Sequence, residues 1–210
     1  MAGPAGQGLH VRAGNAMGRT RDGLLDGALA CIERDGLRRL TMSGICARSG
    51  VAKATLYNHF RTKADVLAAL VGREVDRVAD TALQAAASGG LAEGLDAAVT
   101  YVAGLTAGRT VAGSEPGALV PLVTPGEGPG WLHARQRAAH VLHLDPGHPV
   151  IALTLAWLGS ALLAAPPAAA RHATAILLAD AATAAQLSPP AQPAGGATVV
   201  TVAGAGGANP

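Results

Sequence analysis

Apolar residues recur at helical spacing along most of the chain. In the N-terminal part, Leu25, Ala28, Leu29 and Ile32 follow the i, i+3, i+4, i+7 rule of one helix face, which predicts a helix from about Thr20 to residue 35. The same pattern and its glycine and proline breaks predict further helices at about 41–49, 53–59, 63–86, 91–106, 114–123, 131–142, 150–165 and 168–187. The sequence therefore predicts an all-α protein.

Residues 41–63 combine two short helices with a tight turn and lead into a long helix. Thr41 is a suitable N-cap, and Gly50 is suited to the left-handed backbone that ends a helix. In the second helix Leu56 and Phe60 share one face, which predicts burial, while Asn58 points the opposite way among small and polar residues. A helix of this size fits the major groove of DNA, so the segment is interpreted as a helix-turn-helix with recognition helix 53–59.

The charge distribution favours the same segment. Both lysines of the 210-residue chain, Lys53 and Lys63, lie in it. Residues 1–63 carry ten Lys and Arg against four Asp and Glu, a formal charge of +6, whereas residues 64–210 carry six against ten, or −4. A basic N-terminal part on a mildly acidic remainder is typical of a DNA-binding domain joined to a domain that does not touch DNA.

These residues resemble the DNA-binding domain of the tetracycline-repressor (TetR) family of bacterial regulators. The resemblance covers about residues 20–71 and is carried by GLRRLTMSGICARSGVAKATLYNHF followed by RTKADVL. It implies an N-terminal three-helix helix-turn-helix domain, joined by a long helix to a C-terminal helical ligand-binding and dimerisation domain. The implied function is a homodimeric, ligand-responsive regulator, with a repressor favoured, that reads a palindromic double-stranded DNA operator.

The resemblance also assigns roles to single residues of the helix-turn-helix. Five match positions that usually hold phosphates: Thr41, Ser43, Tyr57, His59 and Lys63. Four match positions that approach bases or adjacent phosphates: Lys53, Ala54, Thr55 and Asn58. Ala52 departs from the family pattern, because a serine usually caps the recognition helix there, and losing a cap costs about 1 kcal/mol.

The remaining helices are expected to hold an unidentified small-molecule effector and the dimer contacts. Candidates for the ligand pocket are Tyr101, Leu105, Leu119, Leu122, Trp131 and Arg135. The last two long helices of this family pair with their copies, and the expected interface residues are Val150, Leu153, Trp157, Ala161, Ile176, Ala179 and Thr183. Core packing is an alternative role for each apolar pocket candidate.

The expected domain boundaries follow from these assignments. A disordered N-terminal arm (1–18) precedes the DNA-binding domain (19–71), which we call the head; the ligand-binding and dimerisation domain (72–187), the body, precedes a disordered tail (188–210). Met17 is an alternative to Met1 as the true start. With two cysteines, Cys31 and Cys46, and no signal peptide, free thiols in the cytoplasm are expected.

Two other classes of protein stay open at this point. A membrane-tethered DNA-binding protein could use the uncharged stretch 150–165, although Pro166 and Pro167 leave it shorter than the ~20 residues of a membrane span. The second class is an enzyme in the helical body. The sequence shows no catalytic triad, paired carboxylates or phosphate-binding loop to support it, and no cofactor is expected. His140, His143 and His148 are near in sequence, but LDPGHP interrupts the helix between them, so no metal site is predicted.

Overall fold

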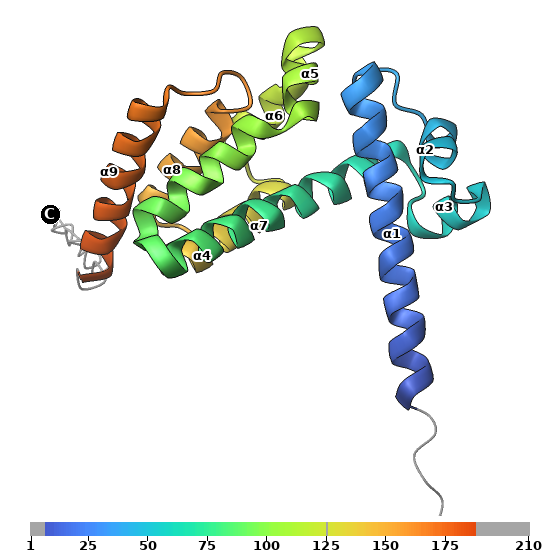
Figure 1. The fold of residues 1–210 in the computed structure, drawn as a ribbon, viewed down its shortest axis with the longest axis horizontal. Coiled ribbons are helices and arrows are strands. Elements are labelled where there is room, and N and C mark those ends of the chain that lie inside the picture. The colour runs from blue at the N-terminus through green and yellow to red at the C-terminus, as the bar shows by residue number, and fades with distance from the viewer. Residues whose placement is uncertain (1–6, 125, 188–210) are drawn as a thin grey trace, which may run out of the picture.

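The computed structural model describes residues 7–124 and 126–187, and helices are the only regular secondary structure in these two ranges (Figure 1). The predicted all-α fold is confirmed. The elements are α1 Gln7–Asp35, α2 Met42–Ser49, α3 Lys53–His59, α4 Lys63–Gly104, α5 Thr106–Ser114, the 3-10 helix η1 Pro116–Leu119, α6 Val120–Val123, α7 Pro129–Leu142, α8 Pro149–Ser160 and α9 Ala168–Leu187.

Helix α1 begins much earlier than the sequence pattern predicts. It starts at Gln7 and runs through Thr20, so most of the segment expected to be a disordered arm is helical. Extending an existing helix by one residue is far easier than nucleating a new one, so the packed part of α1 can carry a continuation without an apolar face. The expected tail, 188–210, lies outside the described residues.

The head has the predicted three-helix core. Leu25 and Ile32 of α1 are 0% and 4% exposed, and Leu56 and Phe60 are 0% and 3% exposed in the same hydrophobic cluster. Burial of the stripe predicted on residues 53–60 is therefore confirmed. The charged and polar side chains on the opposite face of α3 are left outside this core, as the helical periodicity requires.

Gly27 lies where α1 crosses α2. A Cβ added to it would be 2.9 Å from the Cβ of Ser49 and 3.2 Å from the carbonyl oxygen of Ile45. Helix propensity alone marks a glycine inside a helix only as a weak helix former. In the structure Gly27 instead permits a close approach of two helices.

Helix α4 consists of two arms joined at Gly90. The backbone φ of Gly90 is 80°, in the region that favours glycine, and the ribbon turns back on itself there (Figure 1). This confirms the predicted break between the helices expected at 63–86 and 91–106. The first arm leaves the head at Lys63, and the second arm returns along the body to Gly104, where α5 begins after a further bend.

The body packs α7, α8 and α9 against α4, with Leu95, Leu142, Ile151 and Ala175 among its buried residues. Three details differ from the prediction. Helix α5 was not expected; η1 and α6 replace the single helix at 114–123; and α8 ends at Ser160, where bonds of turn type take over, rather than at residue 165.

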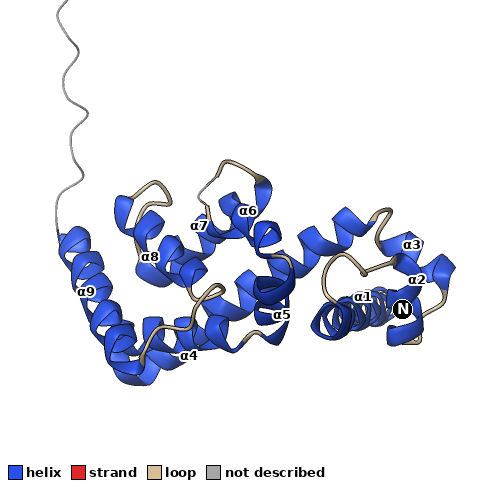
Figure 2. Ribbon diagram, turned by 90° about the horizontal axis from the view of Figure 1, so that it is seen from above, coloured by secondary structure: helices blue, strands red, loops and turns tan. Residues whose placement is uncertain are grey.

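The head and body share one hydrophobic cluster. Val111 of α5 and Leu119 of η1 are 5% and 4% exposed and belong to the same cluster as Ile32. Figure 2 shows α1, α2 and α3 at one end of the molecule, with α5 lying between them and the rest of the body. A displacement of α5 or η1 therefore acts directly on the packing of α1.

Candidate nucleic-acid interface and adjoining cavity

The helix-turn-helix begins and turns as its sequence predicts. The hydroxyl of Thr41 accepts a hydrogen bond of 3.0 Å from the amide of Gly44, and the turn residue Gly50 has a left-handed φ of 68°. Helix α3 then spans Lys53–His59, which matches the predicted recognition helix. Leu56 fixes the rotation of α3, because its fully buried side chain points into the head core.

The outward face of α3 presents a compact polar surface. Lys53, Ala54, Tyr57 and Asn58 are exposed, with Tyr57 at 43%, whereas Thr55 and His59 are half-buried on the flanks. The ammonium nitrogen of Lys53 lies 6.0 Å from the centroid of the Tyr57 ring, within the range of a cation–π contact. Thr41 and Ser43 are exposed at the start of α2. Eight of the nine predicted contact residues are thus at least partly accessible on α2 and α3.

The ninth residue, Lys63, lies at the start of α4 and makes a hydrogen bond within the protein. Its Nζ donates a hydrogen bond of 2.7 Å to the carbonyl oxygen of Leu37, and the side chain is half-buried. Lys63 therefore anchors the loop between α1 and α2. An ammonium group has three donors, so a phosphate contact remains possible beside this bond.

The N-termini of α3 and α4, which lie beside this surface, are capped differently. Ala52 precedes α3 without a side-chain hydrogen bond, in line with the departure noted in the sequence. Helix α4, in contrast, opens with a capping box: the Thr62 hydroxyl accepts from the Asp65 amide at 3.1 Å, and the Asp65 carboxylate accepts from the Thr62 amide at 2.9 Å. The sequence analysis missed this pair, although a threonine followed three residues later by an acidic residue is its signal.

A cavity of about 520 Å³ lies between the head and the body. Its walls come from α1, α4, α5, η1, α6, α7 and α8 and are mostly aliphatic. Four of the six predicted pocket residues line it: Leu105, Leu119, Leu122 and Trp131. Tyr101 and Arg135 do not. The volume falls within the range of about 300–1,000 Å³ that is usual for small-molecule sites.

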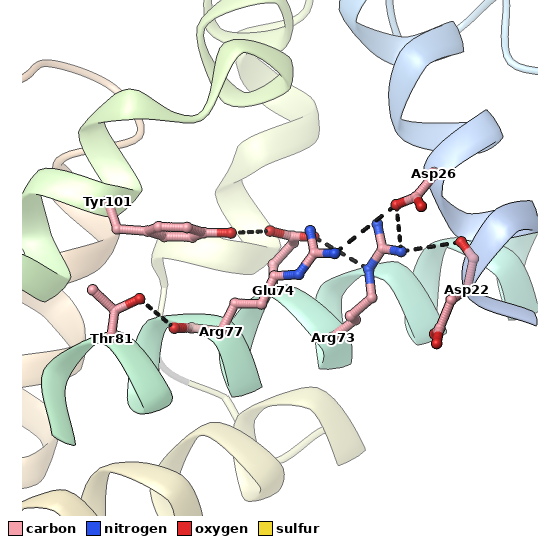
Figure 3. A network of polar contacts seen from close by, with 7 residues as sticks. All are labelled: Asp22, Asp26, Arg73, Glu74, Arg77, Thr81 and Tyr101. Atoms are coloured by element: carbon pink, nitrogen blue, oxygen red, sulfur yellow. Dashed lines mark hydrogen bonds and ion pairs between the residues drawn. The ribbon is translucent and has the colours of Figure 1, made fainter. Parts of the chain in front are cut away.

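The side chain of Tyr101 instead takes part in a polar network beside the cavity (Figure 3). Its hydroxyl donates to Glu74 at 2.8 Å, and Glu74 also accepts from Arg77 at 3.1 Å. Arg73 Nη1 binds the carboxylate of Asp26 at 2.8 Å and the carbonyl of Asp22 at 3.2 Å, both on α1. The network therefore connects α1, the first arm of α4 and the second arm of α4.

The predicted dimer residues fall into three groups by their exposure in the single chain. Val150, Ala161 and Ala179 are less than 9% exposed within a single chain, so they pack inside the body and are not on its surface. Trp157 is half-buried. Leu153, Ile176 and Thr183 are exposed; Leu153 and Ile176 are 61% and 39% exposed. Leu177, which the sequence analysis did not single out, is 69% exposed beside Ile176.

The histidines, the cysteines and the apolar stretch singled out in the sequence show no sign of a metal site, a disulfide or a membrane span in the described residues. His148 caps α8, since its Nδ1 accepts from the Val150 amide at 3.2 Å, and it is separate from the adjacent rings of His140 and His143. Among the described residues no three His, Cys, Asp or Glu side chains are grouped as metal ligands. Cys31 and Cys46 are free thiols, buried and half-buried respectively. In the described parts of the chain, no helix has the length and apolar character needed to cross a membrane.

An exposed recognition helix on a three-helix head, joined to an all-helical body, defines the class of helix-turn-helix DNA-binding proteins. Residues 24–70 match the family model described as bacterial regulatory proteins, tetR family. These residues are therefore similar to the DNA-binding domain of TetR-family regulators.

Two known proteins extend this comparison. The HTH-type transcriptional repressor KstR of Mycolicibacterium smegmatis is 34% identical over 70 residues, which cover 33% of this chain and 34% of that protein. The match thus spans about a third of the curated relative. The crystal structure of a proposed transcriptional regulator from Streptomyces coelicolor A3(2) has a TM-score of 0.50 and 19% identity, covering 77% of this chain and 98% of that one. This likeness shows a shared fold.

Proposed function

We propose that two copies of this chain bind a roughly palindromic double-stranded DNA operator in the cytoplasm and that a small molecule in the cavity weakens this binding. The observation that carries the proposal is the outward face of α3, where Lys53, Ala54, Tyr57 and Asn58 are exposed together. The matched part of KstR, a protein named as a repressor, favours repression over activation.

The contacts assigned to α3 follow from the chemistry of its side chains. Asn58 has the donor and acceptor needed to pair with an adenine edge in the major groove, and Ala54 leaves room for close approach. Lys53 and Thr55 complete the group proposed to reach bases or adjacent phosphates. Thr41, Ser43, Tyr57, His59 and Lys63 are proposed to hold phosphates and so fix the register of α3 on the duplex.

A second copy of the chain is needed for a stable and specific complex. One head offers a single seven-residue helix, whereas a two-fold dimer places two such helices in major grooves one turn, about 34 Å, apart. The exposed apolar side chains on α8 and α9, Leu153, Ile176 and Leu177, support pairing through these two helices. We therefore limit the proposed interface to the exposed residues on the outer faces of α8 and α9, including Thr183.

A ligand in the cavity would contact residues of the head as well as of the body. Its wall includes Leu29 and Ile32 of α1, and Val111 and Leu119 bring body elements into the head core. A ligand changes DNA affinity only when its own affinity differs between the binding and non-binding arrangements of the heads. A cavity shared by both domains supports such a difference, because any repacking around the ligand also changes the packing of α1.

The test is binding of the purified chain to DNA upstream of its own gene across a salt series. The affinity should fall steeply with salt, because phosphate contacts release counterions. Asn58→Ala should weaken specific binding by about 1–3 kcal/mol, the usual value of a good base contact. Gln136→Ala, which removes an exposed carboxamide from α7, is the matched control and should bind normally. Equal affinities for the two variants would refute the assignment of α3.

A further inference from the structure

The cavity has charged groups on its wall, and their partners restrict the ligand. Glu74 is one of them. Its Oε2 accepts from the Tyr101 hydroxyl at 2.8 Å, and its Oε1 accepts from Arg77 at 3.1 Å and lies 3.4 Å from the Nε of Arg73. Both oxygens are thus engaged. A cationic ligand would have to displace one of these partners while lying near two guanidinium groups, which disfavours an ammonium compound.

Arg137 is the second charged residue on the wall. Its Nη2 donates to Asp80 at 2.5 Å, and its Nε lies 3.0 Å from the Oδ1 of Asp76. Two carboxylates therefore already balance its single charge. An anionic ligand would gain little from Arg137 and would be repelled by Asp76 and Asp80.

One donor of Arg137 is nevertheless left over. Its Nε is buried and makes no hydrogen bond of acceptable geometry, in spite of the nearby Asp76. A buried donor without an acceptor is unfavourable, and a neutral oxygen would satisfy it without adding charge. Thr154, a buried polar residue that also lines the cavity, donates its hydroxyl to the Val150 carbonyl at 2.8 Å, so its donor is already satisfied without the ligand.

The rest of the wall is aliphatic over a considerable length. Leu67 contributes near the head, and Asp76, the partner of Arg137, follows nine residues later on the same arm of α4. At 1.5 Å per residue these two positions are about 14 Å apart along the helix. A ligand with its oxygen at Arg137 can therefore extend an apolar chain towards Leu29 and Ile32 of α1, which lie on the same wall.

We infer that the cavity binds a neutral, mainly aliphatic molecule with one oxygen acceptor, such as a long-chain ketone, with the oxygen at Arg137 and the chain directed towards α1. Its role as an effector rests on the proposed function, whereas its binding does not. The chemistry of the wall sets the class of molecule: neutral because both charged residues are already compensated, and aliphatic because the surrounding side chains are.

The test uses the full chain and three probes of equal length: 2-dodecanone, dodecanoate and dodecylamine, each below its micelle concentration at pH 7. Trp131 lines the cavity and reports binding by fluorescence, and Trp157→Phe removes the other tryptophan, which is not on the wall. 2-Dodecanone should bind at least about tenfold more tightly than either charged probe. Shortening it to 2-decanone should weaken binding roughly fifteenfold, at about fourfold per methylene.

Variants of Arg137 locate the oxygen. Arg137→Met and Arg137→Lys both remove the Nε donor, and each should weaken 2-dodecanone binding about tenfold, with the fold checked by circular dichroism. Arg135→Met is the matched control, because Arg135 lies on the same helix but not on the cavity wall, and it should leave binding unchanged. Unchanged affinity in both Arg137 variants, tighter binding of either charged probe, or no binding of the ketone would overturn the inference.

The titration contains no DNA, so its outcome is independent of the operator experiment. Ketone binding with no specific DNA binding would leave the ligand class standing and remove the proposed function. Specific DNA binding by a chain that binds none of the probes would support the proposed function and overturn the inferred ligand class.

Discussion

Gly27 is a residue at which one missing methyl group decides how two helices pack. Gly27→Ala would place a Cβ 2.9 Å from Ser49 Cβ and 3.1 Å from the Ser49 backbone nitrogen, and the backbone atoms cannot move aside cheaply. Overpacking of about 1–3 kcal/mol should outweigh the ~1 kcal/mol that alanine adds to helix propensity. We therefore expect a lower free energy of unfolding, measured by urea denaturation.

Gly23 provides the control for that experiment. It lies on the same helix, but a Cβ there would have no atom within 4 Å. Gly23→Ala should therefore stabilise the chain by up to about 1 kcal/mol through helix propensity alone. If the two alanine variants unfold at the same urea concentration, the close approach at Gly27 does not limit the packing of α1 on α2.

Tyr101 gives a second prediction at this scale. Burial, followed by its hydrogen bond to Glu74, raises the pKa of Tyr101 above 10.0. With Tyr57→Phe removing the other tyrosine, the absorbance of the phenolate should reach its midpoint above pH 10. Because the folded protein holds this proton more tightly than the unfolded chain does, the contribution to stability is complete below pH 10 and is lost as the pH rises through the folded pKa.

Replacing Glu74 separates the effect of its negative charge on the pKa of Tyr101 from the effect of its hydrogen bond. Glu74→Gln keeps a hydrogen-bond acceptor for the Tyr101 hydroxyl but removes the negative charge, so the phenol should ionise at a lower pH than in the parent variant. A titration that reaches its midpoint at or below pH 10 in the parent would contradict the buried, hydrogen-bonded position of Tyr101.

Among the elements, α3 was predicted with its exact bounds and α5 was not predicted at all. The signals for α3 are local: the Gly50 turn and the spacing of Leu56 and Phe60 lie within a few residues. Helix α5 contains Gly108 and Gly113, which weaken it, and its Val111 is buried only because the chain brings it against the head core. Sequence periodicity cannot supply that long-range contact.

The contact between η1 and the head makes a prediction for Glu115. Its Oε1 accepts a hydrogen bond of 2.9 Å from the Arg38 amide, and its side chain is only 11% exposed. Glu115→Ala would leave this amide without its partner and should lower the free energy of unfolding by about 1–3 kcal/mol. Glu127→Ala, where the side chain is 91% exposed, should change it by less than about 0.5 kcal/mol.

Glu115→Gln distinguishes the hydrogen bond from the ion pair with Arg38. The amide oxygen of glutamine can still accept from the Arg38 backbone, so most of the stability should be retained. A glutamine variant as unstable as the alanine variant would show that the 3.5 Å ion pair, and not the hydrogen bond, holds η1 to the head.

For the whole molecule, the proposed dimer depends on the outer faces of α8 and α9. Leu177→Glu places a charge on that surface, where the leucine is 69% exposed in the single chain. If this face is buried between copies, the variant should sediment as a monomer. Leu132→Glu, on α7 at 52% exposure, should remain a dimer. A dimer that persists in the Leu177 variant would place the interface elsewhere.

In the body, the sequence predicts the helices better than it predicts which of their faces are buried. Four of the six pocket candidates line the cavity, since bulky apolar residues of the middle helices tend to face an internal space. The side chains of Tyr101 and Arg135 instead form hydrogen bonds with Glu74 and with the Gly126 carbonyl. On α8 the uniformly apolar sequence did not reveal which face is internal, so buried Val150 and exposed Leu153 were assigned to the same surface. Only the packing of α8 against α4 and α7 shows that Val150 is internal and Leu153 is on the surface.

The shared cluster formed by Val111, Leu119 and the head helices has a consequence for protein engineering. The helix-turn-helix head is not a contiguous segment of the sequence, since two residues of its core, Val111 and Leu119, lie some forty to fifty residues beyond the end of the family match at residue 70. A chimera that grafted residues 1–71 onto a foreign body would expose the apolar side of Ile32. A transplantable head must carry α5 and η1 with it, or receive substitutes for them from its new host.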